Sequence, residues 1–106
     1  MSAARGLCVV LITCPAGPVA QRLAQRLIRE HAAACVNIIA RVDSYFWWQG
    51  KVDYAKERLL IVKTTFTAVT HIRQLLKRHH PYTVPELVAL PIRAGLPAYL
   101  HWVRAS

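Results

Sequence analysis

Residues 37–65 read NIIARVDSYFWWQGKVDYAKERLLIVKTT, and the fold predicted from the sequence depends mainly on this segment. Polar and apolar residues alternate along its first half, as in a β-strand that buries one face. Gln49-Gly50-Lys51 then supplies a turn, because glycine readily adopts the positive φ that a tight reversal needs. The second half ends in the apolar run 59–62, so we expect a return strand and one long β-hairpin. The alternation places on one face of the first arm Val36, Ile38, Ala40, Val42, Phe46 and Trp48, and on the other Asn37, Arg41, Asp43 and Tyr45.

This hairpin is too long and too aromatic for a small domain to cover alone. Each arm exceeds the ~5–6 residues usual for a strand. The tip carries the aromatic run Tyr45, Phe46, Trp47 and Trp48. Long apolar edges that stay exposed promote aggregation, and small domains bury a smaller share of their surface than large ones. We therefore expect another copy of the chain to cover the hairpin.

The remaining segments complete an α+β order. An apolar strand is expected at 7–14, where Pro15 ends it because proline cannot donate to a strand ladder. Amphipathic periodicity predicts helices at 18–33 and 67–79, with Thr67 as a candidate N-cap. A fourth strand is expected at 87–90 and a short terminal helix at 97–104. The resulting β-α-β-β-α-β order with a C-terminal helix is ferredoxin-like, and we expect residues 1–106 to form one domain.

Composition narrows the function classes. The longest apolar runs fall short of the ~20 residues of a membrane span, and we expect no signal peptide because the apolar stretch near the start is needed as a core strand. Three cysteines without paired spacing indicate a reducing compartment and a cytoplasmic protein. The formal net charge of +9 is attributed to solvated helix faces rather than to a specific nucleic-acid site, because no run of like charge or RNA-binding motif accompanies it.

Short motifs spread over the chain allow a family to be named. They are Thr13-Cys14-Pro15, Ala33-Ala34-Cys35-Val36-Asn37, Ser44-Tyr45, Trp47-Trp48-x-Gly50, Ile61-Val62-Lys63-Thr64, His80-Pro81-Tyr82, Val84-Pro85-Glu86, Leu90-Pro91-Ile92, and Gly95 with Pro97, Tyr99-Leu100 and Trp102. In these motifs and their order the chain resembles the CutA family, the divalent-cation tolerance proteins. The resemblance implies a homotrimer of ferredoxin-like subunits, with hairpins paired across subunits and clefts at the interfaces. It also implies a link to tolerance of copper and other divalent cations, and a trimer similar to that of PII-type signalling proteins.

Several positions depart from the family pattern. Thr83 stands where the family often has glutamate, which puts in doubt any metal site that used that carboxylate. Ala98 and His101 stand where acidic residues are common, and Leu96 replaces a frequent asparagine that would cap the terminal helix.

The candidate metal ligands are Cys14, His80 and Glu86. A cysteine thiolate suits copper(I), and Cys14 ends a strand just before a helix N-terminus that could lower its pKa. Imidazole suits copper, zinc and nickel, and His80 precedes a loop held by two prolines. Glu86 could add an oxygen ligand. The alternatives are a buried hydrophobic role for Cys14, a helix-capping role for His80 and an ion pair for Glu86.

A second group of candidates could line an intersubunit cleft: Cys35, Asn37, Trp48, Lys63 and Tyr82. Lys63 and Asn37 are polar residues within strand patterns and could bind an anionic ligand. The alternative for both is a hydrogen bond or an ion pair, for example with Glu57 or Asp43. For Cys35 the alternative is the core, and for the aromatic residues it is interface packing.

The sequence thus predicts a cytoplasmic homotrimer that binds copper or other divalent cations and supports metal tolerance. The alternative is a PII-like signalling module that binds a small anionic ligand and acts on an unidentified protein partner. We expect no enzyme activity, because the five acidic residues show no paired spacing and no nucleophile motif is present. No cofactor is expected to be obligatory, with copper or a related cation as the candidate ligand.

Overall fold

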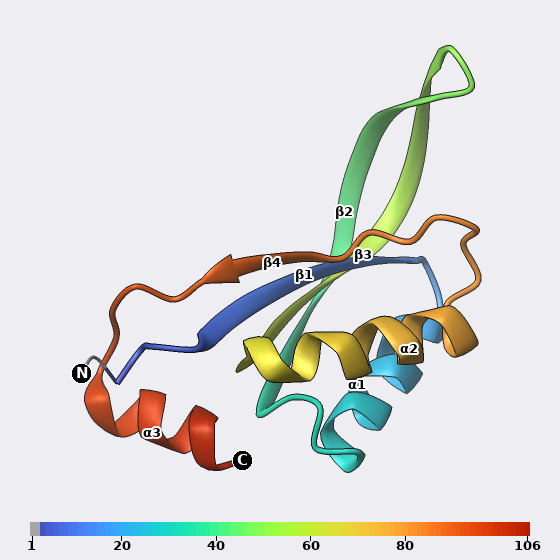
Figure 1. Ribbon diagram of the computed structural model, residues 1–106. Coiled ribbons are helices and arrows are strands. Elements are labelled where there is room, and N and C mark those ends of the chain that lie inside the picture. Colours follow the sequence, from blue (N-terminus) through green and yellow to red (C-terminus); the bar gives the residue numbers. More distant parts are fainter. Residues whose placement is uncertain (1–2) are drawn as a thin grey trace.

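The computed structural model describes residues 3–106 and has the ferredoxin-like element order (Figure 1). The strands are β1 (Leu7–Pro15), β2 (Cys35–Trp48), β3 (Lys51–Thr65) and β4 (Val88–Pro91). The helices are α1 (Val19–Arg29), the 3-10 turn η1 (Phe66–Ala68), α2 (Val69–His79) and α3 (Pro97–Ala105). The predicted fold class, with its long hairpin and short terminal helix, is confirmed. No helix within residues 3–106 has the length and apolar character needed to cross a lipid bilayer.

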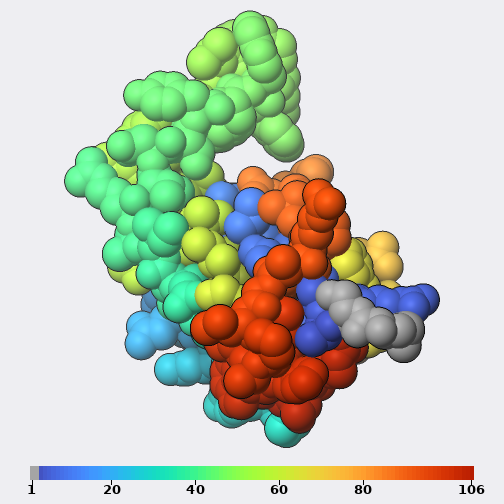
Figure 2. Space-filling view, turned by 90° about the vertical axis from the view of Figure 1, so that its left-hand side faces the viewer, coloured from blue at the N-terminus to red at the C-terminus, as the bar shows by residue number. Residues whose placement is uncertain are grey.

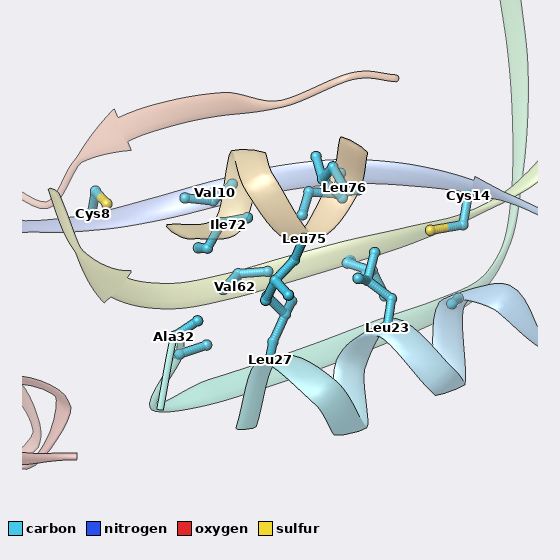
Figure 3. Close-up of a cluster of buried hydrophobic side chains, with 14 residues drawn as sticks. Cys8, Val10, Cys14, Leu23, Leu27, Ala32, Val62, Ile72, Leu75 and Leu76 are labelled. Carbon is cyan, nitrogen blue, oxygen red and sulfur yellow. The ribbon is translucent and has the colours of Figure 1, made fainter. Parts of the chain in front are cut away.

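The four strands form one antiparallel sheet in the order β2-β3-β1-β4. Side chains alternate across a strand, and in β1 the residues Cys8, Val10, Ile12 and Cys14 are completely buried. They form one buried cluster with residues of α1 and α2, and these helices lie together on one side of the sheet (Figures 1 and 3). The residues between them in β1 are only half-buried. The sheet therefore has one face covered by the two long helices and one that is more open.

The core lies between β1, β3 and these two helices (Figure 3). Leu23 and Leu27 of α1 meet Leu75 and Leu76 of α2 over Val62 of β3. Leu23 and Leu27 are four positions apart, which is the spacing of one apolar stripe. Each leucine buried in this way contributes about 1.5–3 kcal/mol of hydrophobic stabilisation. A smaller cluster docks α3 through Leu100 and Val103 against Leu7.

The hairpin of β2 and β3 projects well beyond the body of the molecule (Figures 1 and 2). Trp48 pairs with Lys51, so the reversal consists of Gln49 and Gly50 alone, with φ of 52° and 78°. Two consecutive positive φ values in a two-residue loop are typical of a type I′ turn, whose twist matches that of paired strands. Near the tip, Tyr45 and Trp47 are about three-quarters exposed, at 73% and 75%.

A β-bulge changes the pattern expected along the first arm. Ile39 pairs with Leu59 and Val42 pairs with Glu57, so two residues of β2 lie opposite one residue of β3. Paired residues share a face, and residues an odd number apart in a strand lie on opposite faces. Ile38, paired with Leu60, and Val42, paired with Glu57, are therefore on opposite sides of the hairpin. The prediction that one face runs unbroken from Val36 to Trp48 is wrong, because the bulge inserts one residue.

Two helix boundaries also differ from the expected ones. The first helix ends at Arg29 rather than at residue 33, and His31 adopts a φ of 56°, which turns the chain towards β2. Thr67 does not cap the second helix, since it lies within η1, and its hydroxyl is 2.9 Å from that of Thr65. Ala68 occupies the N-cap position without a side-chain hydrogen bond. As expected, Leu96 precedes α3 without capping it and Pro97 begins the helix.

Candidate functional site

A groove of about 810 Å³ lies between the hairpin and residues 81–86, the segment that links α2 to β4. Figure 2 shows the hollow between the green hairpin and the orange part of the chain. Four of the five acidic residues of the chain line this groove: Asp43, Asp53, Glu57 and Glu86. The fifth, Glu30, follows α1 and is bound there by Arg26 and His71. A chain with a net charge of +9 thus gathers most of its negative charge around one hollow.

His80 fixes one wall of the groove. It is buried at the end of α2, and its Nε2–H donates to the carbonyl oxygen of Thr13 at 2.8 Å. The backbone N–H of Tyr82 donates to Nδ1 of the same ring at 3.1 Å. Because Nδ1 accepts a hydrogen bond, the proton of the imidazole is on Nε2. Both ring nitrogens are therefore engaged by backbone groups, which holds the 81–86 segment against the end of β1.

Tyr82 and Glu57 meet inside the groove. The hydroxyl of Tyr82 donates to Oε2 of Glu57 at 2.7 Å. Burial raises the pKa of Tyr82 strongly, and the hydrogen bond with Glu57 and its negative charge add to the effect. Glu57 is only 7% exposed, and within residues 3–106 no lysine, arginine or histidine forms an ion pair with it. A buried carboxylate normally has such a partner, so Glu57 is the most unusual charged group of the site.

Glu86 lies on the loop side of the same groove. Desolvation raises the pKa of Glu86, and the nearby Glu57 carboxylate raises it further. The charge of Glu86, which the Glu57 carboxylate disfavours, would be stabilised by a cation bound nearby. The pair Glu57 and Glu86 therefore has the electrostatics of a cation site.

Cys14 lies at the end of β1, completely buried in the core that faces the helices, and directly follows Thr13, which lines the groove. Burial raises the pKa of Cys14 to about 11, with a further contribution from the charge of Glu57. The expectation that the following helix would lower this pKa is wrong, because burial and the charge of Glu57 raise it. Cys14 is a neutral thiol at neutral pH, whereas metal binding requires the thiolate.

The three predicted metal ligands approach the same end of β1, from three segments of the chain. Thr13, which accepts the hydrogen bond of His80, and Glu86 both line the groove, and Cys14 follows Thr13 directly. Within residues 3–106, however, no group of three or more His, Cys, Asp or Glu side chains forms a metal-binding arrangement. The metal site of Cys14, His80 and Glu86 stays a prediction. Oxygen donors from Glu57 and Glu86 fit a hard or borderline divalent cation better than a soft one.

The predicted cleft residues separate into two places. Trp48 and Tyr82 line the acidic groove. Cys35, Asn37 and Lys63 lie together at the base of the hairpin, where Lys63 Nζ donates to Oδ1 of Asn37 and Cys35 pairs with Lys63 across the strands. The hydrogen bond that was the alternative for Asn37 and Lys63 is thus present. From the sequence, Glu57 is only a possible ion-pair partner, and its place in the groove is not predicted. The one signal for that place is that the chain has few acidic residues and that three of them fall in the hairpin.

These features define a small α+β protein of ferredoxin-like topology with an acidic groove beside a projecting hairpin. Residues 8–106 match the family model described as CutA1 divalent ion tolerance protein. The chain therefore belongs to the CutA1 family.

Known relatives agree with this assignment. The divalent-cation tolerance protein CutA of Thermus thermophilus is 50% identical over 98 residues, which are 92% of this chain and 95% of that protein. A solved structure of the Cut A1 protein from Thermus thermophilus has a TM-score of 0.91 at 48% identity, covering 93% of this chain and 96% of that one. The chloroplastic CutA 1 of rice is 43% identical over 98 residues, but the chain spans about half of that protein, 55%.

A further solved structure bears a different functional label. It is described as the PII-like protein CutA from Nostoc sp. PCC 7120 in apo form. Its TM-score is 0.84 at 30% identity, with 92% of this chain and 94% of that chain covered. This chain is therefore also similar in structure to a protein described as PII-like.

Proposed function

We propose that this protein is a cytoplasmic homotrimer that binds a divalent cation, copper(II) among the candidates, in the acidic groove and thereby supports tolerance of such ions. One observation carries the proposal: in a chain of net charge +9, the buried Glu57 carboxylate lines the same groove as Glu86 and has no cationic partner within residues 3–106. The family name, which refers to divalent ions, supports the same role. The proposed role is binding and not catalysis.

The chemistry of the groove defines the ligand set that we propose. Glu57 and Glu86 supply carboxylate oxygens, and Asp43 and Asp53 add negative charge around them. Cys14 faces the helices, on the other side of β1 from Thr13, and is not part of the ligand set that we propose. His80 would act as a positioning residue that holds the loop of Glu86, since both of its ring nitrogens are hydrogen-bonded. Of the three residues predicted from the sequence, Glu86 is thus a proposed ligand and His80 a positioning residue.

The proposed trimer accounts for the projecting hairpin. Tyr45, Trp47 and Val52 expose 73%, 75% and 64% of their surfaces in the single chain. Surfaces of this kind usually belong to an interface. The three cysteines are free, which supports a reducing compartment such as the cytoplasm.

Calorimetric titration with copper(II), zinc and nickel tests the cation site, with molar mass measured by light scattering. We expect one site per subunit, and at least about a tenfold loss of affinity in Glu86→Gln, since one charged oxygen ligand is removed. Glu30→Gln is the matched control, because it removes the one acidic residue outside the groove. Affinity should also fall as pH falls through the raised pKa of Glu86, since protons then compete with the cation. Weak, multiple binding that is equal in both variants would refute the site.

A small anionic ligand is the second candidate. The similarity to a protein described as PII-like and the exposed Asn37 beside Lys63 support it. A ligand that binds the folded state raises the thermal midpoint by mass action. A thermal-shift screen of nucleotides and carboxylic acids, repeated on Lys63→Gln, should then find a compound whose effect depends on Lys63. The absence of any shift at millimolar concentrations would count against this candidate.

A further inference from the structure

A second hollow, distinct from the acidic groove, lies on the helical side of the molecule. It is formed by α1 and the end of α2, has a volume of about 370 Å³ and shares no residue with the acidic groove. Its lining consists of Val19, Arg22, Leu23, Gln25, Arg26, Arg29 and His79. Figure 1 shows α1 and α2 together on one side of the sheet, while the hairpin projects from it. We call this hollow the basic groove.

The periodicity of α1 concentrates positive charge at the basic groove. Arg22, Arg26 and Arg29 are spaced i, i+4 and i+7, so they lie along one side of the helix. His79, the last residue of α2, approaches from the other helix. Neither α1 nor α2 contains an acidic residue, although together they carry six of the chain's 14 lysines and arginines.

The positive charge of this groove is only partly compensated. Arg26 donates to Glu30 at 3.1 Å, and Glu30 is also 3.0 Å from His71, so this acid is shared between two partners. Among residues 3–106, Arg22 and Arg29 form no ion pair and no side-chain hydrogen bond. Like charges at i and i+4 or i+7 on one helix repel each other. An anion bound between them would remove this repulsion.

The shape and the side-chain types indicate which anion fits. Guanidinium groups present a planar set of donors that matches the oxygens of a phosphate group. A volume of about 370 Å³ is at the lower end of the range for small-ligand pockets, roughly 300–1,000 Å³. Three arginines and a histidine around one concave surface suit several linked phosphates better than a single charge. A nucleic-acid strand would instead require basic groups that follow an extended backbone.

We propose that the basic groove is a binding site for a compact polyphosphate anion, either inorganic polyphosphate or the triphosphate of a nucleotide, held by Arg22 and Arg29 with His79. Arg26 remains with Glu30 and contributes its charge. The site is separate from the cation groove, so one chain would carry receptors for ions of opposite sign in two distinct hollows.

Calorimetric titration with sodium tripolyphosphate tests this proposal on the full chain. In Arg22→Gln/Arg29→Gln we expect at least about a tenfold loss of affinity, because two charge-assisted phosphate contacts are removed. The matched control is Arg73→Gln/Arg78→Gln, which makes the same change of net charge on α2 outside the groove and should alter affinity by less than about threefold. Circular dichroism of both variants verifies that they are folded. Equal losses in both variants, or no saturable binding at physiological salt, would overturn the proposal.

Two further titrations separate the sources of the phosphate. Binding of ATP but not of AMP, with the same dependence on Arg22 and Arg29, would assign a nucleotide triphosphate, and tighter binding of tripolyphosphate than of ATP would assign an inorganic chain. Both results support the site. A short RNA strand that binds to all variants alike, without competition from tripolyphosphate, would show an unspecific charge effect and would refute it.

Discussion

His80 connects three segments of the chain through its imidazole ring and its backbone N–H. Through Nε2 it reaches Thr13 at the end of β1, through Nδ1 it receives the N–H of Tyr82, and its own backbone N–H closes α2 on Leu76. Its ring also lies 4.8 Å from that of Tyr82, measured between centroids. The sequence identifies this histidine, which precedes a proline loop, as a candidate ligand. Its ring nitrogens bond to the backbone of Thr13, which is 67 positions away, and to that of Tyr82, which is two positions away. No sequence pattern shows that these groups come together.

His80→Ala should lower the free energy of unfolding by about 2–4 kcal/mol, because two hydrogen bonds are lost and buried backbone groups are left without partners. His79→Ala is the control: this neighbouring side chain is exposed and its removal should cost less than about 0.5 kcal/mol. Urea unfolding at one fixed protein concentration measures both. Equal effects of the two substitutions would contradict the role assigned to His80.

Because the pKa of Cys14 is raised, we expect the free energy of unfolding to fall at alkaline pH. The pKa of its thiol is raised from 9.0 to about 11 in the folded chain. Between these pH values the unfolded chain has released the proton and the folded chain retains it, so the unfolded state binds fewer protons and stability falls as pH rises. Relative to Cys14→Ala, which cannot titrate, the unsubstituted chain should lose of order 2 kcal/mol more between pH 9 and pH 11. Parallel stability curves would contradict this expectation.

At the scale of elements, the hairpin depends on its two-residue turn. Gly50 has a φ of 78°, and an added Cβ would meet no atom within 4 Å, so the backbone conformation alone restricts this position. Periodicity was sufficient to predict both arms of the hairpin, since alternation and apolar runs are local signals. It could not predict the bulge between Ile39 and Val42, because pairing with β3 determines where one residue of β2 is left over.

Gly50→Ala should destabilise the chain by about 1–2 kcal/mol, because an L-residue with a side chain disfavours the left-handed region. Gln49 also has a positive φ, of 52°, and asparagine tolerates this conformation better than glutamine. Gln49→Asn should therefore have the opposite sign, with a gain of a few tenths of a kcal/mol. Thermal and urea unfolding of both variants provide the comparison, and a loss of the same size in each would exclude the type I′ turn as the cause.

At the scale of the whole molecule, the proposed trimer rests on the hairpin tip. Trp47 and Val52 pair across the strands and are mostly exposed in the single chain. Trp47→Lys/Val52→Glu preserves net charge and permits a cross-strand ion pair, but it removes apolar contact area. We expect this variant to be a folded monomer by light scattering and circular dichroism. Gln21→Lys/Gln74→Lys, which changes two exposed helix positions, should remain a trimer.

A trimeric Trp47→Lys/Val52→Glu variant would refute the architecture inferred from the hairpin.

The acidic groove was only partly predictable from the sequence. Glu86 belongs to a family motif, but Asp43, Asp53 and Glu57 are distant from it in sequence and line the same groove only because the hairpin lies beside the 81–86 segment. Such a meeting depends on tertiary geometry, which a pattern of single residues does not contain.

Charge is distributed unevenly over the molecule. The helices α1 and α2 carry six positive side chains from lysine and arginine and no negative ones, whereas four of five carboxylates surround the groove beside the hairpin. The hairpin strands also carry five basic residues, Arg41, Lys51, Lys56, Arg58 and Lys63, so the helical side is the more positive one and the chain is a dipole as well as a net cation. A strongly anionic surface would orient it with the helices inward and the hairpin groove outward. In that orientation the groove remains open to dissolved ions, and salt would weaken the alignment before it weakened the fold.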